Sequence, residues 1–186
     1  PLRTNPEWTI LRILQWASTY FKNRGIESPH AAAEILLAHA LGTDRVHLYM
    51  HHDQPLDRTE LALFKTFIQR RLQREPVAYI VGKKEFWSFP FHVNKHVLIP
   101  RPETEILVEA ILKICSDMAK RILRILEIGT GCGAISIALA SELKNAQIVA
   151  TDISPDALAV AMKNAKNNNV AHRISFILGN LFQPVS

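Results

Sequence analysis

One stretch in the C-terminal half of the sequence constrains the fold more than any other. An apolar segment, residues 122–128, runs into residues 129–133, where glycine stands at the first, third and fifth positions. A second apolar segment, residues 147–151, ends directly on Asp152. Apolar strands that alternate with helical segments are typical of a parallel α/β sheet. The sequence therefore predicts a strand, a tight glycine turn, a helix and a second strand that ends beside the turn.

A turn of this kind indicates a binding site for a cofactor that contains a nucleoside. Glycine lets the backbone approach a ligand where a side chain would collide, and the helix behind the turn presents unpaired N–H groups to an anion. Asp152, about 20 residues after the glycines, is placed to accept hydrogen bonds from two ribose hydroxyls. A tight turn without a ligand is the competing interpretation, and the spacing of Asp152 argues against it.

Two cofactors compete for this predicted site. Gly129, Gly131 and Ala134 satisfy the dinucleotide pattern G-x-G-x-x-[GA], which favours NAD. Gly133 and Glu127 favour S-adenosylmethionine instead, because a carboxylate ahead of the turn can face the ammonium and sulfonium charges of that cofactor. These residues therefore favour the methyl donor and leave NAD as the alternative.

The N-terminal part of the sequence predicts only helices, in a small bundle with short connections. Two helix starts place proline at the first helical position, after Asn5 and after Ser28. A short helix is expected over residues 45–51, and Asp57 with Glu60 forms a capping-box pattern that begins a further helix. The apolar face of that further helix consists of Leu61, Phe64, Ile68 and Leu72.

Three other groups of side chains in this part are interpreted structurally. Trp8 and Trp16 are expected in the core, together with the leucine and phenylalanine stripes. The basic side chains within residues 65–74 are interpreted as a solvated helix face, with docking to an acidic surface as the alternative. His47 and His51 are expected to share one helical face as a surface pair, because a metal site would need a third ligand.

The pattern of the chain changes after residue 75. Residues 84–94 are aromatic and β-like, and predict a hairpin whose turn lies at residues 88–90. Residues 103–118 predict an amphipathic helix. Further along, residues 154–156 provide a helix start in the order N-cap, N1, N2, and residues 174–178 predict a third parallel strand.

Three segments outside the glycine turn resemble one known family. Residues 75–82 (EPVAYIVG), 85–94 (EFWSFPFHVN) and 97–105 (VLIPRPETE) closely resemble the HemK/PrmC family, whose members methylate a glutamine of peptide-chain release factors at its side-chain amide nitrogen. The run PRPETE ahead of a Gly-Thr-Gly-x-Gly turn is highly specific to that family. A stiff linker whose acids cap a helix is the plainer interpretation of the run, and both can hold.

The resemblance extends over essentially the whole chain and implies its architecture. It implies an α/β protein with a small N-terminal helical bundle and a truncated class I S-adenosylmethionine-dependent methyltransferase domain of Rossmann-like fold. The implied divisions are a substrate-recognition domain at residues 1–75, a linker with a β-hairpin at 76–100, and the first part of the methyltransferase domain at 101–186.

The resemblance also implies roles for particular residues. Asp152 corresponds to the ribose-binding acid, and Asn180 and Leu181 correspond to positions beside the adenine, where many relatives carry Asp in place of Asn180. Thr104 and Phe86 resemble positions that line the cofactor and substrate pocket. The positions around the methionine part of the cofactor are Gly129, Thr130, Gly131, Cys132 and Gly133.

One family motif, Asn-Pro-Pro-Tyr after the fourth strand, occurs nowhere in this sequence. In the family, its asparagine side chain and a backbone carbonyl hold the N–H groups of the substrate amide. That grip aligns a poorly nucleophilic nitrogen with the methyl group. We therefore expect this chain to contain the cofactor half of the site and no catalytic residue. A polypeptide ending at Ser186 is expected to bind the cofactor weakly and to be inactive.

The leading interpretation is transfer of a methyl group to the glutamine N5 of a release factor. One alternative is a nucleic-acid adenine N6-methyltransferase, which uses a related turn and motif and would flip its target base out of the duplex. Residues 100–105 argue against that alternative. A non-catalytic fragment that only binds a partner is the third possibility.

Composition narrows the setting and the partners. The net charge of +5 permits an acidic partner without requiring one. The two cysteines, Cys115 and Cys132, lack metal-ligand spacing, which favours a reduced setting and no bound metal. The sequence contains no apolar run of about 18 residues, as a membrane span would need. We expect a cytoplasmic monomer, or a mitochondrial one in a eukaryote, that acts on a release factor without direct nucleic-acid binding.

Overall fold

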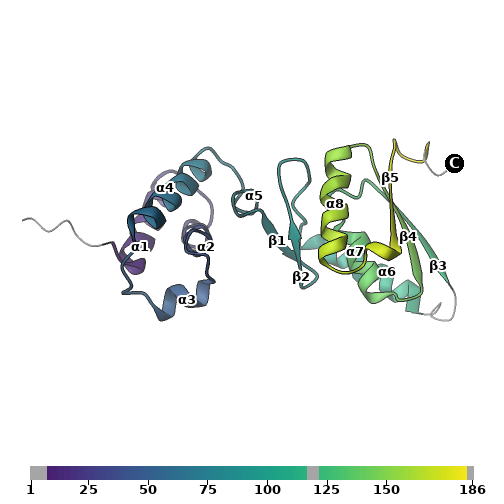
Figure 1. Ribbon diagram of the computed structural model, residues 1–186, viewed down its shortest axis with the longest axis horizontal. Helices are drawn as coiled ribbons and strands as arrows, with labels where there is room; N and C mark the ends of the chain where they lie inside the picture. Colours follow the sequence, from purple (N-terminus) through teal and green to yellow (C-terminus); the bar gives the residue numbers. More distant parts are fainter. Residues whose placement is uncertain (1–7, 117–121, 184–186) are drawn as a thin grey trace, which may run out of the picture. The chain divides into compact units, whose positions relative to one another are not determined.

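The computed structural model describes residues 8–116 and 122–183 of the chain (Figure 1). The chain divides into two compact units, Pro1–Val81 and Gly82–Ser186. Among the described residues, no helix is both long enough and apolar enough to cross a membrane.

The first unit is helical and is built around one apolar core. Phe21, Leu36 and Phe64 come from three different helices and are enclosed in this core. The helices of the unit are α1 (Ile10–Asn23), α2 (Pro29–Ala40), α3 (Arg45–Met50), α4 (Arg58–Leu72) and α5 (Val77–Val81). The short helix α5 was not predicted from the sequence.

The first helix begins later than its proline signal predicted. Thr9 is the N-cap of α1, and its hydroxyl accepts the Arg12 N–H at 3.4 Å. The chain just before α1 is extended, because Ile10 N–H donates to the Gln54 carbonyl at 3.0 Å. Asn5, the predicted cap, lies outside the described residues.

The other helix starts agree with the sequence patterns. Asp57 and Glu60 form the predicted capping box of α4, with both hydrogen bonds at 2.8 Å. Ser154 caps the later helix by accepting the Ala157 N–H at 3.2 Å. Ser28 precedes α2 as predicted, but its side chain makes no cap hydrogen bond.

The two tryptophans of the first unit are not in its core, so that prediction was wrong. Trp8 is 37% exposed and Trp16 is 44% exposed. The buried face of α1 is already formed by Ile13, Ala17 and Phe21, which leaves Trp16 on the adjoining face. The tryptophans instead contact each other edge to face, with ring centroids 6.1 Å apart.

The arginines at the C-terminal end of α4 are hydrogen-bonded to the protein rather than simply solvated, whereas Lys65 is exposed as predicted. Arg70 pairs with Glu75 through two hydrogen bonds of 2.6 and 2.7 Å. Just beyond α4, Arg74 donates to the Gly25 carbonyl at 2.7 Å. These contacts hold the C-terminal end of α4 in place. His47 and His51 do share a face, with stacked rings 4.1 Å apart.

The second unit starts with a hairpin of β1 (Lys83–Phe86) and β2 (Phe89–His92) and continues as an α/β sheet. The hairpin turn is at Trp87 and Ser88, both with positive φ, rather than at the predicted residues 88–90. Pro90 lies within β2, opposite Glu85. The remaining elements are α6 (Glu103–Ser116), β3 (Leu123–Ile128), α7 (Ala134–Glu142), β4 (Ala146–Asp152), α8 (Pro155–Asn167), the 3-10 helix η1 (Ala171–Arg173) and β5 (Ile174–Leu178).

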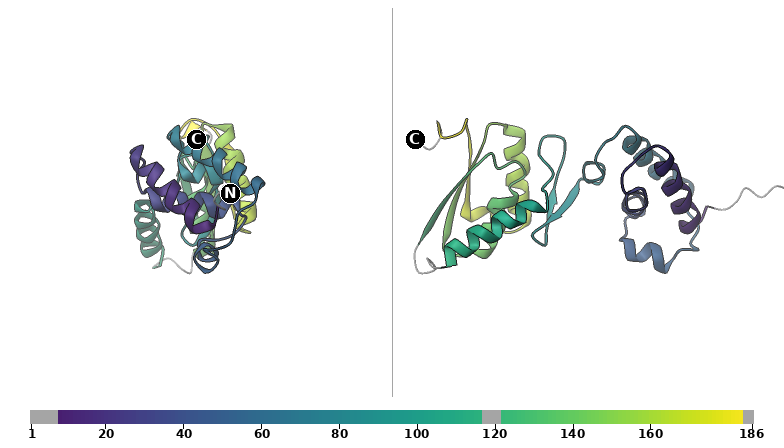
Figure 2. Two further views of the ribbon diagram at one scale, coloured as in Figure 1. Left: turned by 90° about the vertical axis from the view of Figure 1, so that its left-hand side faces the viewer. Right: turned by 180° about the vertical axis from the view of Figure 1, so that it is seen from behind.

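The sheet is parallel, in the order β3-β4-β5, and its helices lie on one side (Figures 1 and 2). Side chains that point toward the helices, such as Ile148 and Ala150, are buried. The opposite face is open, with Leu126 41% exposed. Within the described residues, β3 is an edge strand, and it leads directly into the glycine turn.

Candidate cofactor site

The carboxyl ends of the three parallel strands bring the predicted site together. The N–H groups of Gly129 and Thr130 both donate to the Thr151 carbonyl, at 2.8 and 2.9 Å. The Gly179 N–H donates to the Asp152 carbonyl at 3.0 Å. The turn after β3, the acid after β4 and the segment after β5 therefore lie side by side, where ligands bind to open parallel sheets.

Asp152 closes one side of the glycine turn. Its Oδ2 accepts the Gly131 N–H at 2.8 Å, and its Oδ1 accepts the Ser154 N–H at 2.9 Å. An ionised carboxylate offers about four lone-pair positions. Each Asp152 oxygen therefore retains acceptor capacity, which is the chemistry that two ribose hydroxyls require.

Glu127 is turned toward the inside of the turn. Its Oε2 accepts from the Thr130 hydroxyl at 2.8 Å and from the Ser136 N–H at 3.1 Å, and it also receives the Ser136 hydroxyl. Burial raises the pKa of Glu127, the hydrogen bonds from Ser136 and Thr130 oppose that rise, and the charge of Asp152 adds to it. Glu127 thus joins the turn to the start of α7, and its predicted contact with a cofactor stays a prediction.

Glycine is required at the three positions of the turn for different structural reasons. Gly129 and Gly131 have φ of 75° and 56°, and a Cβ added to either would have no protein atom within 4 Å. Their Cα atoms therefore face open space, as a backbone that receives a ligand requires. Gly133, with φ of 83°, is enclosed: a Cβ there would lie 3.1 Å from Ile137 and 3.2 Å from Ala161. Gly133 lets the turn pack on α7 and α8.

The other predicted site residues come from separate elements. Asn180 and Leu181 are exposed directly after β5, and Leu181 has a positive φ of 49°. Thr104 is half-buried in the first turn of α6. Phe86 is 2% exposed and packs edge to face on Phe91 inside the second unit, so it is a core residue here.

Two buried polar residues near the turn were missed by the sequence analysis. Ser136 and Asn164 are both 0% exposed, and each bonds to a residue within or next to the glycine turn. Ser136 binds Glu127, and Asn164 binds the Cys132 carbonyl. The signal that was available is a polar side chain on the otherwise apolar, inward face of a helix.

The residues present fit a nucleoside cofactor that carries an amino-acid group. Open space lies over Gly129 and Gly131, and Asp152 has acceptors to offer beside it. Across residues 8–116 and 122–183, no group of three or more His, Cys, Asp or Glu side chains is arranged to hold a metal ion.

Comparison with known proteins gives matches for both units. Residues 12–82 match the family model of the PrmC N-terminal domain, and residues 119–185 match that of a methyltransferase domain. The release factor glutamine methyltransferase of Rhodopirellula baltica is 41% identical over 177 residues, which cover 94% of this chain and 60% of that protein. The protein of the same name from Geobacter sulfurreducens is 41% identical over 178 residues, covering 96% and 61%.

A solved structure also overlaps the chain. The tRNA m1G37 methyltransferase of M. jannaschii is 25% identical where it matches, over 54% of this chain and 30% of that chain, with a TM-score of 0.44.

The parallel sheet, its glycine turn and the domain match define the second unit as a methyltransferase domain with the class I fold. With the PrmC N-terminal domain ahead of it and relatives of 41% identity along nearly its whole length, the chain belongs to the PrmC family. The chain spans about 60% of the length of these two curated relatives.

Proposed function

We propose that the protein containing this chain transfers a methyl group from S-adenosylmethionine to the side-chain amide nitrogen, N5, of a glutamine in a peptide-chain release factor. The observation that carries the proposal is the 41% identity to release factor glutamine methyltransferases over 94% of the chain. The glycine turn with Asp152 beside it supports the cofactor part of the proposal. We further propose a cytoplasmic monomer as the working form.

The residues of this chain would bind and orient the methyl donor. When bound, S-adenosylmethionine supplies a methyl group on a positively charged sulfur, which is a good leaving group. Asp152 would accept the ribose hydroxyls, and the open backbone of Gly129 and Gly131 would lie against the methionine part. Asn180 and Leu181 would border the adenine, and Thr104 would line the pocket from α6. Cys132, Thr130, Gly133 and Glu127 would shape the turn from behind.

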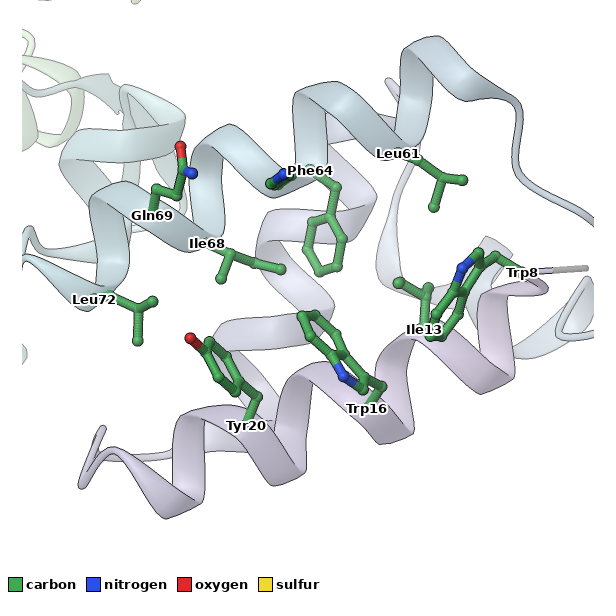
Figure 3. Close-up of a pocket in the computed structure, with 10 residues that line it drawn as sticks. Trp8, Ile13, Trp16, Tyr20, Leu61, Phe64, Ile68, Gln69 and Leu72 are labelled. Carbon is green, nitrogen blue, oxygen red and sulfur yellow. The ribbon is translucent and has the colours of Figure 1, made fainter. Parts of the chain in front are cut away.

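We also propose that the first unit recognises the release factor, through an apolar groove between α1 and α4 (Figure 3). Trp16 and Tyr20 stack 5.2 Å apart on α1, facing Phe64 and Ile68 of α4 across the groove. The groove encloses about 360 Å³. Such aromatic anchors favour an apolar segment of a partner.

Charge beside the groove favours a partner segment with acidic neighbours. Lys65 lines the groove, and the Arg24 guanidinium lies 5.2 Å from the Tyr20 ring centre. We therefore propose that the groove binds an apolar segment of the release factor that is flanked by acidic side chains.

Replacement of Trp16 tests the groove. Trp16→Ala should raise the KM for the release factor about tenfold, with the affinity for S-adenosylmethionine unchanged. Leu11→Ala is the matched control, since Leu11 is similarly exposed on α1 but lies outside the groove.

The function is tested by methyl transfer with the product of the complete reading frame. Labelled S-adenosylmethionine is incubated with a purified release factor, and the label should appear on one glutamine, identified by peptide mass spectrometry. A polypeptide ending at Ser186 should transfer none, because it lacks an Asn-Pro-Pro-Tyr motif. Labelling of adenine in DNA, with the release factor unmodified, would contradict the proposal and favour an adenine N6-methyltransferase. Absence of transfer to both would favour a binding role only.

A further inference from the structure

Asn164 of α8 is a completely buried carboxamide whose hydrogen-bonding groups are all matched. Its Oδ1 accepts the His92 N–H at 2.7 Å. Its Nδ2 donates to the His92 carbonyl at 3.0 Å and to the Cys132 carbonyl at 2.9 Å. Only this orientation of the amide satisfies all three bonds, because the opposite one would place oxygen against two carbonyl oxygens.

These bonds connect three segments that are far apart in the sequence. Cys132 lies inside the glycine turn, His92 ends the hairpin strand β2, and Asn164 lies in the last part of α8. One helical turn before Asn164, Ala161 packs against Gly133, where a Cβ would be 3.2 Å away. The same face of α8 therefore supports the turn by packing and by a hydrogen bond.

The hairpin is held at its other end as well. At its tip, the Trp87 N–H donates to Glu105 of α6 at 2.8 Å, and the Trp87 indole N–H donates to Glu142 of α7 at 2.9 Å. The hairpin thus connects α6, which carries Thr104, with α8, which supports the glycine turn. Asn164 makes hydrogen bonds both to the hairpin and to the turn.

We propose that Asn164 is a positioning residue for the cofactor turn: it holds the Cys132 carbonyl toward α8, so that the open side of the turn is presented to the cofactor. The proposal rests on the proposed function, since it assumes that this turn binds S-adenosylmethionine. Without the Asn164 donors, the buried Cys132 carbonyl and the part-buried His92 carbonyl would lose these hydrogen bonds. The turn would then rotate to recover them, which costs affinity for the cofactor.

Asn164→Asp tests the proposal in the product of the complete reading frame. The oxygen that accepts the His92 N–H is retained, and both donors are lost when the acid is ionised. We expect the Kd for S-adenosylmethionine, measured by calorimetry, to rise about tenfold at pH 8. Protonation restores one donor, so the defect should shrink as pH falls toward about 5.5, since burial raises the pKa of an aspartic acid. The wild-type Kd measured at the same pH values is the reference for this comparison.

Asn168→Ala is the matched control. Asn168 also joins α8 to the hairpin, through the Pro90 carbonyl at 3.3 Å, but makes no recorded bond to the turn. The Kd of this variant should equal that of the wild type. An equal loss of affinity in Asn168→Ala, or an Asn164→Asp variant that is folded and binds normally at every pH, would overturn the proposal.

Hydrogen exchange on the wild type covers the case in which Asn164→Asp does not fold. The backbone N–H of His92 donates to the Asn164 Oδ1. Saturation with S-adenosylmethionine should slow hydrogen exchange at this N–H more than at the backbone N–H of Lys84, which lies nearer the hairpin tip. Unchanged protection of His92 would overturn the proposal. A wild-type protein that does not bind S-adenosylmethionine would instead show that the proposed function itself is wrong.

Discussion

The Asp152 carboxylate accepts the Gly131 N–H at 2.8 Å, so that the acid after β4 closes the turn that follows β3. These two residues are 21 positions apart in the chain, and parallel pairing of their strands brings them together. Asp152 therefore both shapes the turn and presents its remaining acceptors at the opening.

Replacement of Asp152 should weaken cofactor binding more than it weakens the fold. Asp152→Ala removes the proposed ribose acceptors together with the bonds from Gly131 and Ser154. We expect a Kd for S-adenosylmethionine at least tenfold higher and a loss of about 1–3 kcal/mol in unfolding free energy. Asp152→Asn keeps one acceptor oxygen, so its Kd and its unfolding free energy should lie between those of the wild type and those of Asp152→Ala. Calorimetry and urea unfolding measure the two effects, and an unchanged Kd in Asp152→Ala would mean that the ribose assignment is wrong.

Alanine at Gly131 and at Gly133 should have different consequences. Both positions have positive φ, which costs a non-glycine residue about 1 kcal/mol. A Cβ at Gly131 meets only open space in the protein, so Gly131→Ala should remain folded but exclude the cofactor. A Cβ at Gly133 meets Ile137 and Ala161, so Gly133→Ala should lower the unfolding free energy by about 2–4 kcal/mol. Thermal unfolding measures the stability of the two variants, and calorimetry measures their affinity for S-adenosylmethionine. Equal stability of Gly131→Ala and Gly133→Ala would contradict the different roles assigned to the two glycines.

The two thiols should differ in reactivity. Burial raises the pKa of Cys132 to about 11, so about one thiol in a thousand is ionised at pH 8. Cys132 is also only 3% exposed, whereas Cys115 is half-buried in α6. We expect iodoacetamide at pH 8 to label Cys115 first and Cys132 only after denaturation, as read by peptide mass spectrometry. Labelling of both at one rate in the native protein would show that the turn opens readily.

The first unit should lose stability in acid through Glu34. Burial opposes ionisation of Glu34, but hydrogen bonds from Tyr49 and Arg45, with the charges of Arg45 and His30, bring its pKa below the ordinary value. The unfolded chain therefore takes up the proton first as pH falls. The stabilisation is complete above about pH 5 and is lost as pH falls through the lower, folded pKa.

This acid dependence can be measured with Trp8 and Trp16, which report on the first unit once Trp87 is replaced by Phe. In the Trp87→Phe background, the unfolding free energy should decline below about pH 5. Adding Glu34→Gln should make the protein less stable at pH 7 and flatten this decline. A decline of the same steepness in both proteins would assign the effect to other carboxylates.

Local sequence signals were sufficient to predict most of the helices and strands. Asp57 with Glu60, and Ser154 with Pro155, were predicted as helix starts and are confirmed, because a cap depends on residues within one turn of each other. The predicted start of α1 was wrong because a long-range hydrogen bond, from the Ile10 N–H to the Gln54 carbonyl, keeps the preceding chain extended. Trp16 was predicted in the core as a large apolar side chain, and that character does not show which face of α1 the neighbouring helices cover.

The sequence by itself determined the family, the alternation of strands and helices, and the turn with Asp152 at its expected distance, because these depend on short-range patterns. Only the tertiary structure decided what each residue of the turn does. Gly131 faces open space and Gly133 faces α8, although both are glycines in the same motif. Glu127 binds Ser136, and Asn164 reaches across 32 positions to the Cys132 carbonyl. The glycine turn owes its shape to these distant partners, and such contacts exist only once the strands and helices have packed together.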